Sequence, residues 1–109
     1  MLGPFVSGAV IALRVEQISD LVRVGSAFRD QITGALADPT TVTFRTIAPD
    51  GTRTALVYGV DAAVVRDALG EYRCDVELDA DGRWRFRWEG TGALVTADEA
   101  ELVVAVSPF

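Results

Sequence analysis

The sequence predicts an all-β protein that folds as an antiparallel β-sandwich. Polar and apolar residues alternate along several short stretches, which is the pattern of strands with one buried face. Turn sequences rich in Gly, Pro and Asp separate these stretches. The chain has 109 residues, of which 50% are hydrophobic, and a net charge of −6. These values fit one domain with one hydrophobic core and exclude a disordered chain. No apolar run reaches the length of a membrane helix.

The alternating stretches give the predicted strands. In chain order they are residues 21–29, 41–48, 53–60, 71–78, 83–89 and 101–106. The alternation is clearest in the fifth, where Trp84, Phe86 and Trp88 share one face and three arginines share the other. With a possible first strand near the N-terminus, the count is six or seven. Strands at this spacing predict an immunoglobulin-like antiparallel β-sandwich of about seven strands, with a small barrel as the alternative.

A strong turn sequence separates the strands predicted at residues 41–48 and 53–60. Pro49 presets φ, Asp50 can accept a hydrogen bond from the turn backbone, and Gly51 tolerates a positive φ. Residues 41–60 are therefore predicted to form a β-hairpin. The next segment, residues 61–70, leaves two alternatives open, because its alanines favour a helical turn and its paired valines favour a strand.

The connection between residues 71–78 and 83–89 also leaves two alternatives. Direct pairing across a four-residue loop would put a core side chain opposite an arginine, so it requires a three- or five-residue loop or a bulge. Alternatively, the chain crosses between the two sheets at this turn. Aspartate–glycine–aromatic sequences mark such crossings, and either Asp81–Trp84 or Asp67–Tyr72 could be this corner.

The N-terminal segment is apolar. We divide the chain into residues 1–15, an apolar arm or first strand, and residues 16–109, the sandwich domain. The arm lacks a basic region and a small-residue cleavage site, so we do not expect a secretory signal. An apolar arm can dock on a neighbouring subunit, and we expect deletion of residues 1–13 to leave the fold intact but to abolish this docking. The candidate partner-binding residues are Met1, Leu2, Phe5, Val6, Val10 and Ile11, together with Pro108 and Phe109 at the other terminus.

The composition limits the chemistry. The chain contains no His, Lys or Asn, and all ten cationic side chains are Arg. Because histidine is the most common general base and metal ligand, we expect no enzyme activity, cofactor or metal. The acidic balance argues against a nucleic-acid partner. The one cysteine, Cys74, cannot form an internal disulfide and is expected in the core.

Two clusters of acidic residues are candidate sites. Asp75 and Glu77 share the polar face of one strand, where we expect a solvated surface with ion pairs to Arg85 or Arg87. The acidic turn at residues 77–82 resembles the start of a calcium loop but lacks the acid that completes it.

The aromatic and arginine rows of residues 83–89 have functional alternatives. The row Trp84, Phe86 and Trp88 could stack on a sugar, but strict alternation is expected of a core strand. The row Arg83, Arg85 and Arg87 could bind phosphate or a polysaccharide, although the neighbouring acids weaken that interpretation.

The stretch from Asp38 to Gly92 resembles small immunoglobulin-like proteins encoded among the structural genes of tailed bacteriophages and prophages. The resembling elements are the Asp38–Val42 strand entry, Pro49–Asp50–Gly51, Tyr58–Gly59, Val65–Arg66–Asp67, Gly70–x–Tyr72, Gly82–Arg83–Trp84 and Arg87–Gly92. The segment from Asp20 to Asp30 is similar to the first core strand of that group. The apolar arm departs from the pattern.

The resemblance implies a non-enzymatic virion structural protein. It would be capsid-associated, as a decoration or cement protein, or lie at the head–tail junction. Its partners would be capsid or head–tail proteins and copies of itself, without nucleic acid or membrane, and its location the virion, assembled in the host cytoplasm. A glycan-binding adhesion module is the alternative, and it requires exposed aromatic side chains.

Overall fold

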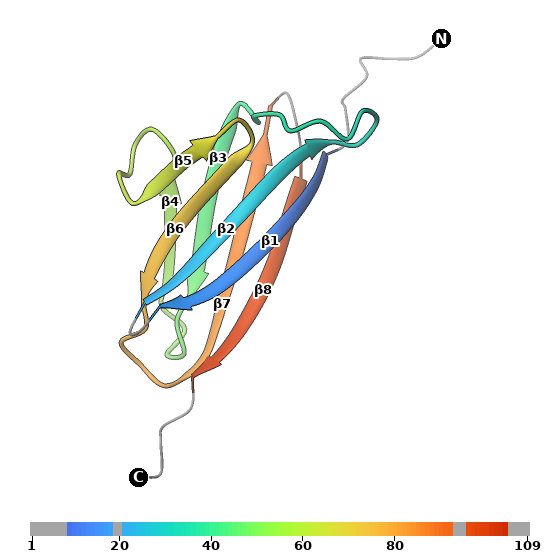
Figure 1. The fold of residues 1–109 in the computed structure, drawn as a ribbon. Helices are drawn as coiled ribbons and strands as arrows, with labels where there is room; N and C mark the ends of the chain where they lie inside the picture. Colours follow the sequence, from blue (N-terminus) through green and yellow to red (C-terminus); the bar gives the residue numbers. More distant parts are fainter. Residues whose placement is uncertain (1–8, 19–20, 93–95, 105–109) are drawn as a thin grey trace.

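The protein is a sandwich of two antiparallel, four-stranded sheets (Figure 1). The computed structural model describes residues 9–18, 21–92 and 96–104. In spatial order, the first sheet consists of β1 (Ala9–Ile18), β2 (Leu21–Asp30), β6 (Glu71–Glu77) and β5 (Val64–Ala68). The second consists of β4 (Arg53–Val57), β3 (Thr41–Ile47), β7 (Gly82–Thr91) and β8 (Thr96–Val104).

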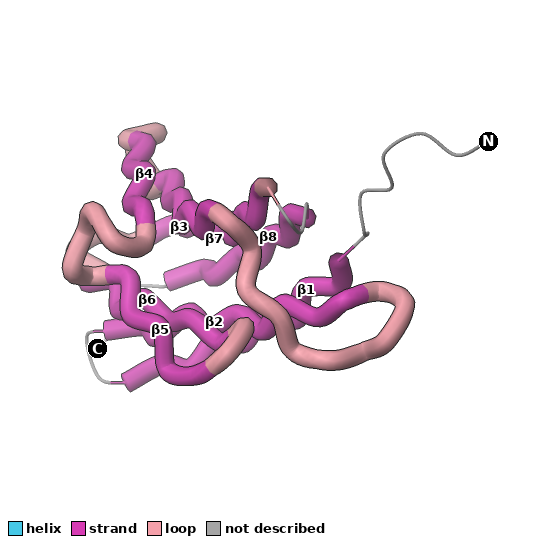
Figure 2. Tube along the Cα trace, turned by 90° about the horizontal axis from the view of Figure 1, so that it is seen from above, coloured by secondary structure: helices cyan, strands magenta, loops and turns pink. Residues whose placement is uncertain are grey.

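This strand order is that of an immunoglobulin-like sandwich. Lettered in chain order, the sheets read A-B-E-D and C′-C-F-G, which is the immunoglobulin arrangement with one added strand beside C. The predicted fold class is confirmed, and the barrel alternative is wrong because the strands form two separate sheets. Figure 2 shows the two layers from above, with the long loop after β2 running from one layer to the other.

The core lies between the sheets and follows the alternation of the sequence. The apolar face of each central strand is buried while its other face carries charge. The fully buried side chains are Val22, Val24, Phe28, Val42, Phe44, Cys74, Phe86 and Trp88. On the side of the second sheet, stacked and tilted pairs of aromatic rings from β3 and β7 fill the core. The ring centres of Phe44 and Trp88 are 4.7 Å apart.

The predicted hairpin at residues 41–60 is confirmed, since β3 pairs with β4. Of the two alternatives for residues 61–70, the strand is correct. This strand is β5, in which Val64 reaches the core and the following residues pair with β6. The last strand begins at Thr96, five residues before the predicted start, because the polar segment there pairs with β7. Residues 105 and 106 of that prediction lie outside the described residues.

The chain crosses between sheets after β6, so the direct pairing of residues 71–78 with 83–89 is wrong. The corner is the first of the two candidates. Trp84 lies at the start of β7, and its indole Nε1 donates a hydrogen bond to the carbonyl oxygen of Ala80 at 3.0 Å. This is the bond that a tyrosine makes at the same corner of immunoglobulin domains. The Asp67–Tyr72 segment turns between neighbouring strands of one sheet. Among the described residues, no helix has the length and hydropathy of a membrane span.

Candidate functional site

The outer face of the second sheet carries half of the arginines of the chain. The cross-strand register brings together on this face Arg45, Arg53, Arg83, Arg85 and Arg87, with Glu89, Glu99 and Glu101 between them. Five cations and three anions give this face a net charge of +2, although the whole chain carries −6. The arginine row predicted for β7 is therefore part of a larger cationic surface, which we call the arginine face.

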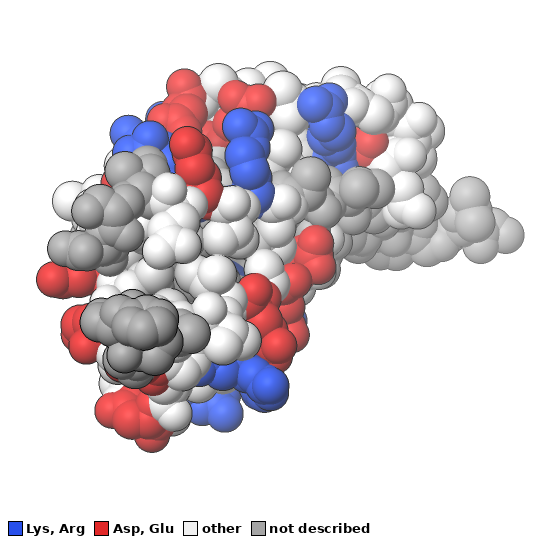
Figure 3. Space-filling view, turned by 60° about the horizontal axis from the view of Figure 1, so that its bottom comes forward, with Lys and Arg blue, Asp and Glu red and all other residues white. Residues whose placement is uncertain are grey.

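Most of the arginines on this face are neutralised by ion pairs. Arg85 Nε lies 3.1 Å from Glu101, Arg87 lies 2.5 Å from Glu99, and Arg45 contacts Glu89. These side chains are exposed, so each pair adds little stability. Space-filling views show arginines directly beside acidic side chains over the surface (Figure 3). Arg53, on the edge strand β4, is the arginine of this face without an ion pair among the described residues.

A hollow of about 690 Å³ opens on the arginine face, beside β4. Its charged lining consists of four arginines and two glutamates: Arg45, Arg53, Arg85, Arg87, Glu89 and Glu99. Ala55 leaves it open because its side chain is a single methyl group. Guanidinium groups bind carboxylates through paired hydrogen bonds. Arg53, which has no ion pair among the described residues, can therefore bind an acidic side chain at the β4 side of this hollow.

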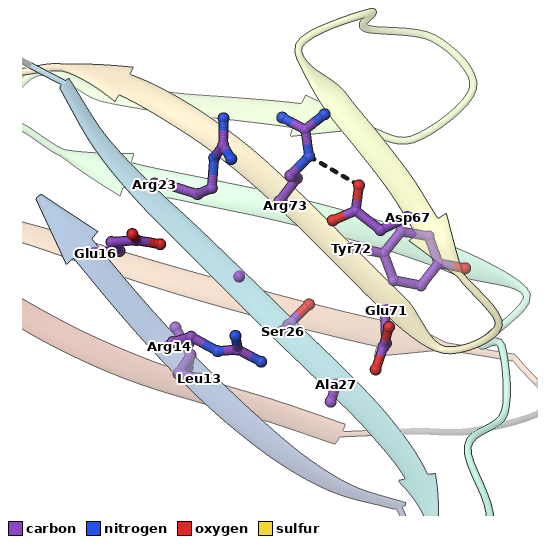
Figure 4. Close-up of a pocket in the computed structure, with 11 residues that line it drawn as sticks. Leu13, Arg14, Glu16, Arg23, Ser26, Ala27, Asp67, Glu71, Tyr72 and Arg73 are labelled. Carbon is purple, nitrogen blue, oxygen red and sulfur yellow. Dashed lines mark hydrogen bonds and ion pairs between the residues drawn. The ribbon is translucent and has the colours of Figure 1, made fainter. Parts of the chain in front are cut away.

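A second hollow, of about 610 Å³, lies on the outer face of the first sheet (Figure 4). Gly25 on β2 forms its floor, since it has no side chain. The charged residues around it come from four strands and balance one another: Arg14, Glu16, Arg23, Asp67, Glu71 and Arg73. The Arg73 Nε donates to Asp67 at 2.8 Å. The walls of this hollow therefore carry three cations and three anions and have no net charge.

The carboxylate of Asp38 organises a hydrogen-bond network at one end of the sandwich. Its Oδ1 accepts from the Gly70 amide at 2.7 Å, from the Tyr72 hydroxyl at 2.9 Å and from Arg66 Nε at 3.2 Å. Its Oδ2 accepts from Arg66 Nη2 at 2.9 Å. The hydrogen bond from Arg66 is the main cause that lowers the pKa of Asp38. Burial, together with Asp38, raises the pKa of Tyr72 to about 12.

This network joins several elements that carried the sequence resemblance. Asp38 begins the strand entry, Arg66 stands in Val65–Arg66–Asp67, and Gly70 and Tyr72 form the Gly–x–Tyr step. They hold the loop before β3 against the β5–β6 turn. Their role in this chain is structural.

The nucleophile and aromatic candidates lie in the core. Cys74 is 1% exposed, as predicted, and burial raises its thiol pKa to about 11. Trp84 is 5% exposed, and Phe86 and Trp88 are buried more completely still, so this row offers no platform to a sugar. Among the described residues, no group of three His, Cys, Asp or Glu side chains is placed to hold a metal ion.

The predicted ion pairs of the acidic strand face are wrong in their partners. Asp75 binds Arg23 of β2, with Nε and Oδ1 2.8 Å apart, and not Arg85 or Arg87. The reason is topological, since β6 and β7 belong to different sheets. The hydrogen bond from Arg23 lowers the pKa of Asp75.

The N-terminal candidates are only partly within the described residues. Val10 and Ile11 belong to β1, where they pair along the backbone with Arg29 and Phe28. This strand continues to Ile18, beyond the proposed arm boundary at residue 15. The candidates Met1, Leu2, Phe5, Val6, Pro108 and Phe109 lie outside the described residues.

The edge strand β4 was not singled out from the sequence. Its signal was an uncharged run, Thr54–Val57, directly after a turn. Comparison with known proteins adds no identification: the chain matches no protein-family model, no curated protein and no solved structure.

Proposed function

We propose that the protein is a non-enzymatic structural component of a tailed-phage particle, attached to the capsid exterior or at the head–tail junction. It binds neighbouring subunits through a sheet edge and through its N-terminal segment. The partners are capsid or head–tail proteins and further copies of the chain. Many symmetric copies convert weak individual contacts into stable attachment.

The distribution of reactive and binding groups over the fold supports the non-enzymatic, protein-binding part of this proposal, and the sequence resemblance of residues 38–92 supports its assignment to a phage particle. The thiol of Cys74 and the hydroxyl of Ser26 are buried, so neither can attack a substrate. The polar groups of the two outer faces are arranged as ion-paired surfaces. An immunoglobulin-like sandwich with such faces and a free sheet edge is suited to binding other proteins.

The test uses particles from a producing culture. Particles are banded on a density gradient, and the chain is quantified by mass spectrometry against the major shell protein. A fixed ratio in the band supports the proposal, and its value separates shell-wide decoration from one ring at a vertex. A chain found only in the soluble fraction, and absent from intact particles, would overturn it.

The contribution of the N-terminal segment needs a shorter deletion than the sequence indicated. Removing residues 1–13 would take away half of β1, including Leu13, which packs against the core. Removing residues 1–8 leaves every described pair of β1 with β2. We expect this deletion to keep the melting temperature and to reduce incorporation into particles. Unchanged incorporation would remove the N-terminal segment from the mechanism.

A further inference from the structure

The edge strand β4 is the least protected sheet edge in the described part of the chain. At the far side of the same sheet, β8 carries Asp98, Glu99 and Glu101. In the other sheet, β5 has a register shift before Ala68 and two charged residues, and β1 lies beside β8. Charges and bulges at an edge prevent pairing with other strands. Between Thr54 and Val57, β4 has neither.

Two backbone hydrogen bonds, one at each end of β4, show which of its residues bond to β3. The Tyr58 amide donates to the Val42 carbonyl oxygen at 3.0 Å, and the Ala48 amide donates to the Thr52 carbonyl oxygen at 2.9 Å. Hydrogen-bonded pairs alternate along an antiparallel ladder. The even-numbered residues of β4 therefore bond to β3, and the odd-numbered residues direct their amide and carbonyl groups away from the sheet.

Within the described part of the chain, Arg53 and Ala55 present unpaired backbone groups at this edge. The amide and carbonyl of Arg53 and of Ala55 face outward. The edge ends at Val57, because its amide donates to Asp61 Oδ2 at 2.8 Å and its carbonyl oxygen accepts from the Val60 and Asp61 amides. Four backbone groups are therefore available, which suits three or four residues of an added strand.

The charge next to this edge selects the added strand. The side chains of Arg53 and Ala55 lie on the arginine face, and Arg45 is the cross-strand neighbour of Ala55. A strand added at β4 lies about 4.8 Å from it and about 9.6 Å from β3. An acidic side chain on the added strand can reach Arg53 directly. Arg45, beyond the methyl group of Ala55, already contacts Glu89, so Arg53 is the principal charged partner. Arg53 has no ion pair among the described residues to compete with it.

We propose that β4 binds an extended, acidic segment of a partner protein as a fifth antiparallel strand of this sheet. The partner strand bonds to the free backbone groups of Arg53 and Ala55, and its Asp or Glu side chains, at alternate positions, enter the hollow of the arginine face. This inference supplies the partner chemistry for the sheet-edge contact and rests on the proposed function in that respect.

The test measures binding of a defined peptide to the purified full chain. The probe is an acetylated and amidated octapeptide of alternating glutamate and threonine, titrated into ¹⁵N-labelled protein. We expect amide chemical-shift changes concentrated at residues 53–57 and weaker binding of the matched lysine–threonine peptide. Equal binding of both peptides, changes concentrated on β5 or β8, or no binding at millimolar peptide would each overturn the proposal.

Two pairs of variants separate backbone and charge recognition. Ala55→Pro removes an amide that the sheet does not use, and Ala55→Ser retains it. Arg53→Glu reverses the charge beside the edge, and Arg83→Glu makes the same change on β7, away from it. We expect Ala55→Pro and Arg53→Glu each to weaken binding at least about tenfold, with the two controls within about twofold of the original chain. If Ala55→Pro unfolds the protein, the Arg53→Glu and Arg83→Glu pair still decides, since equal losses would overturn the proposal.

The competing occupant is a second copy of the chain. Sedimentation of the protein without peptide tests this, and a dimer that Ala55→Pro abolishes would overturn the partner-strand proposal. The peptide-binding result is independent of the particle test. Peptide binding without particle incorporation would refute the proposed function alone, and incorporation without peptide binding would refute this inference alone.

Discussion

Replacing Asp38 with alanine removes the carboxylate that holds the β5–β6 turn against the loop before β3. The Gly70 amide and the Tyr72 hydroxyl are part-buried and lose their acceptor. Each such loss costs about 1–3 kcal/mol. Because the Asp38 side chain is 33% exposed, water replaces part of what is lost. We therefore expect a destabilisation of about 2–4 kcal/mol, against a typical total of about 5–15 kcal/mol.

The assay is urea unfolding at neutral pH, with a thermal melt as a second probe. The melting temperature should fall by roughly 10–20 °C, as expected for a domain of this size. The control is Tyr72→Phe, which removes one donor and keeps the carboxylate. It should cost about 1 kcal/mol in the original chain and less in the Asp38→Ala background. Equal costs in both backgrounds, or a loss below about 0.5 kcal/mol for Asp38→Ala, would refute the reasoning.

The stability lost in Asp38→Ala should also depend on pH. The pKa of Asp38 is lowered by folding, so the unfolded state binds the proton more readily. This contribution to stability is present above the unfolded pKa of about 3.9 and is lost as the pH falls through the folded value. The stability difference between the original chain and Asp38→Ala should therefore shrink below about pH 4. A difference that stays constant from pH 7 to pH 2 would contradict a charged hydrogen-bond acceptor at this position.

Three further substitutions or reagents test other parts of the fold. Gly70→Ala should lower the free energy of unfolding, measured in urea, by more than about 2 kcal/mol. The φ of Gly70 is +73°, and a methyl group there would lie 2.7 Å from the Phe28 carbonyl oxygen and 2.9 Å from the Ala37 amide nitrogen. A neutral result would show that this turn can relax. Ser26→Ala should be neutral or stabilise the fold by up to about 1 kcal/mol, because the buried hydroxyl has no hydrogen-bond partner among the described residues. A clear loss in the same assay would reveal a partner such as a bound water. Cys74 should resist a thiol reagent at pH 8 in the folded protein and react on unfolding, because burial raises its pKa to about 11; rapid labelling of the native protein would contradict its place in the core.

The sequence by itself determined which side of each strand is buried. The period-two alternation of residues 83–89 put Trp84, Phe86 and Trp88 in the core, and the Pro49–Gly51 turn defined the hairpin of β3 and β4. These features could be predicted because side-chain alternation and turn conformation depend on residues close together in the chain. The candidate site could be predicted only as a single row of arginines, since the row lies within one strand.

Only the tertiary structure decided which strands become neighbours. It put β6 and β7 in different sheets, and so gave Asp75 the partner Arg23 in place of Arg85 or Arg87. It gathered the arginines of three strands on one face and left β4 at the edge. The alternation is the same whichever strands pair, because a strand buries the same face beside any neighbour. Pairing is decided by contacts between residues far apart in the chain, and these exist only once the whole core has packed.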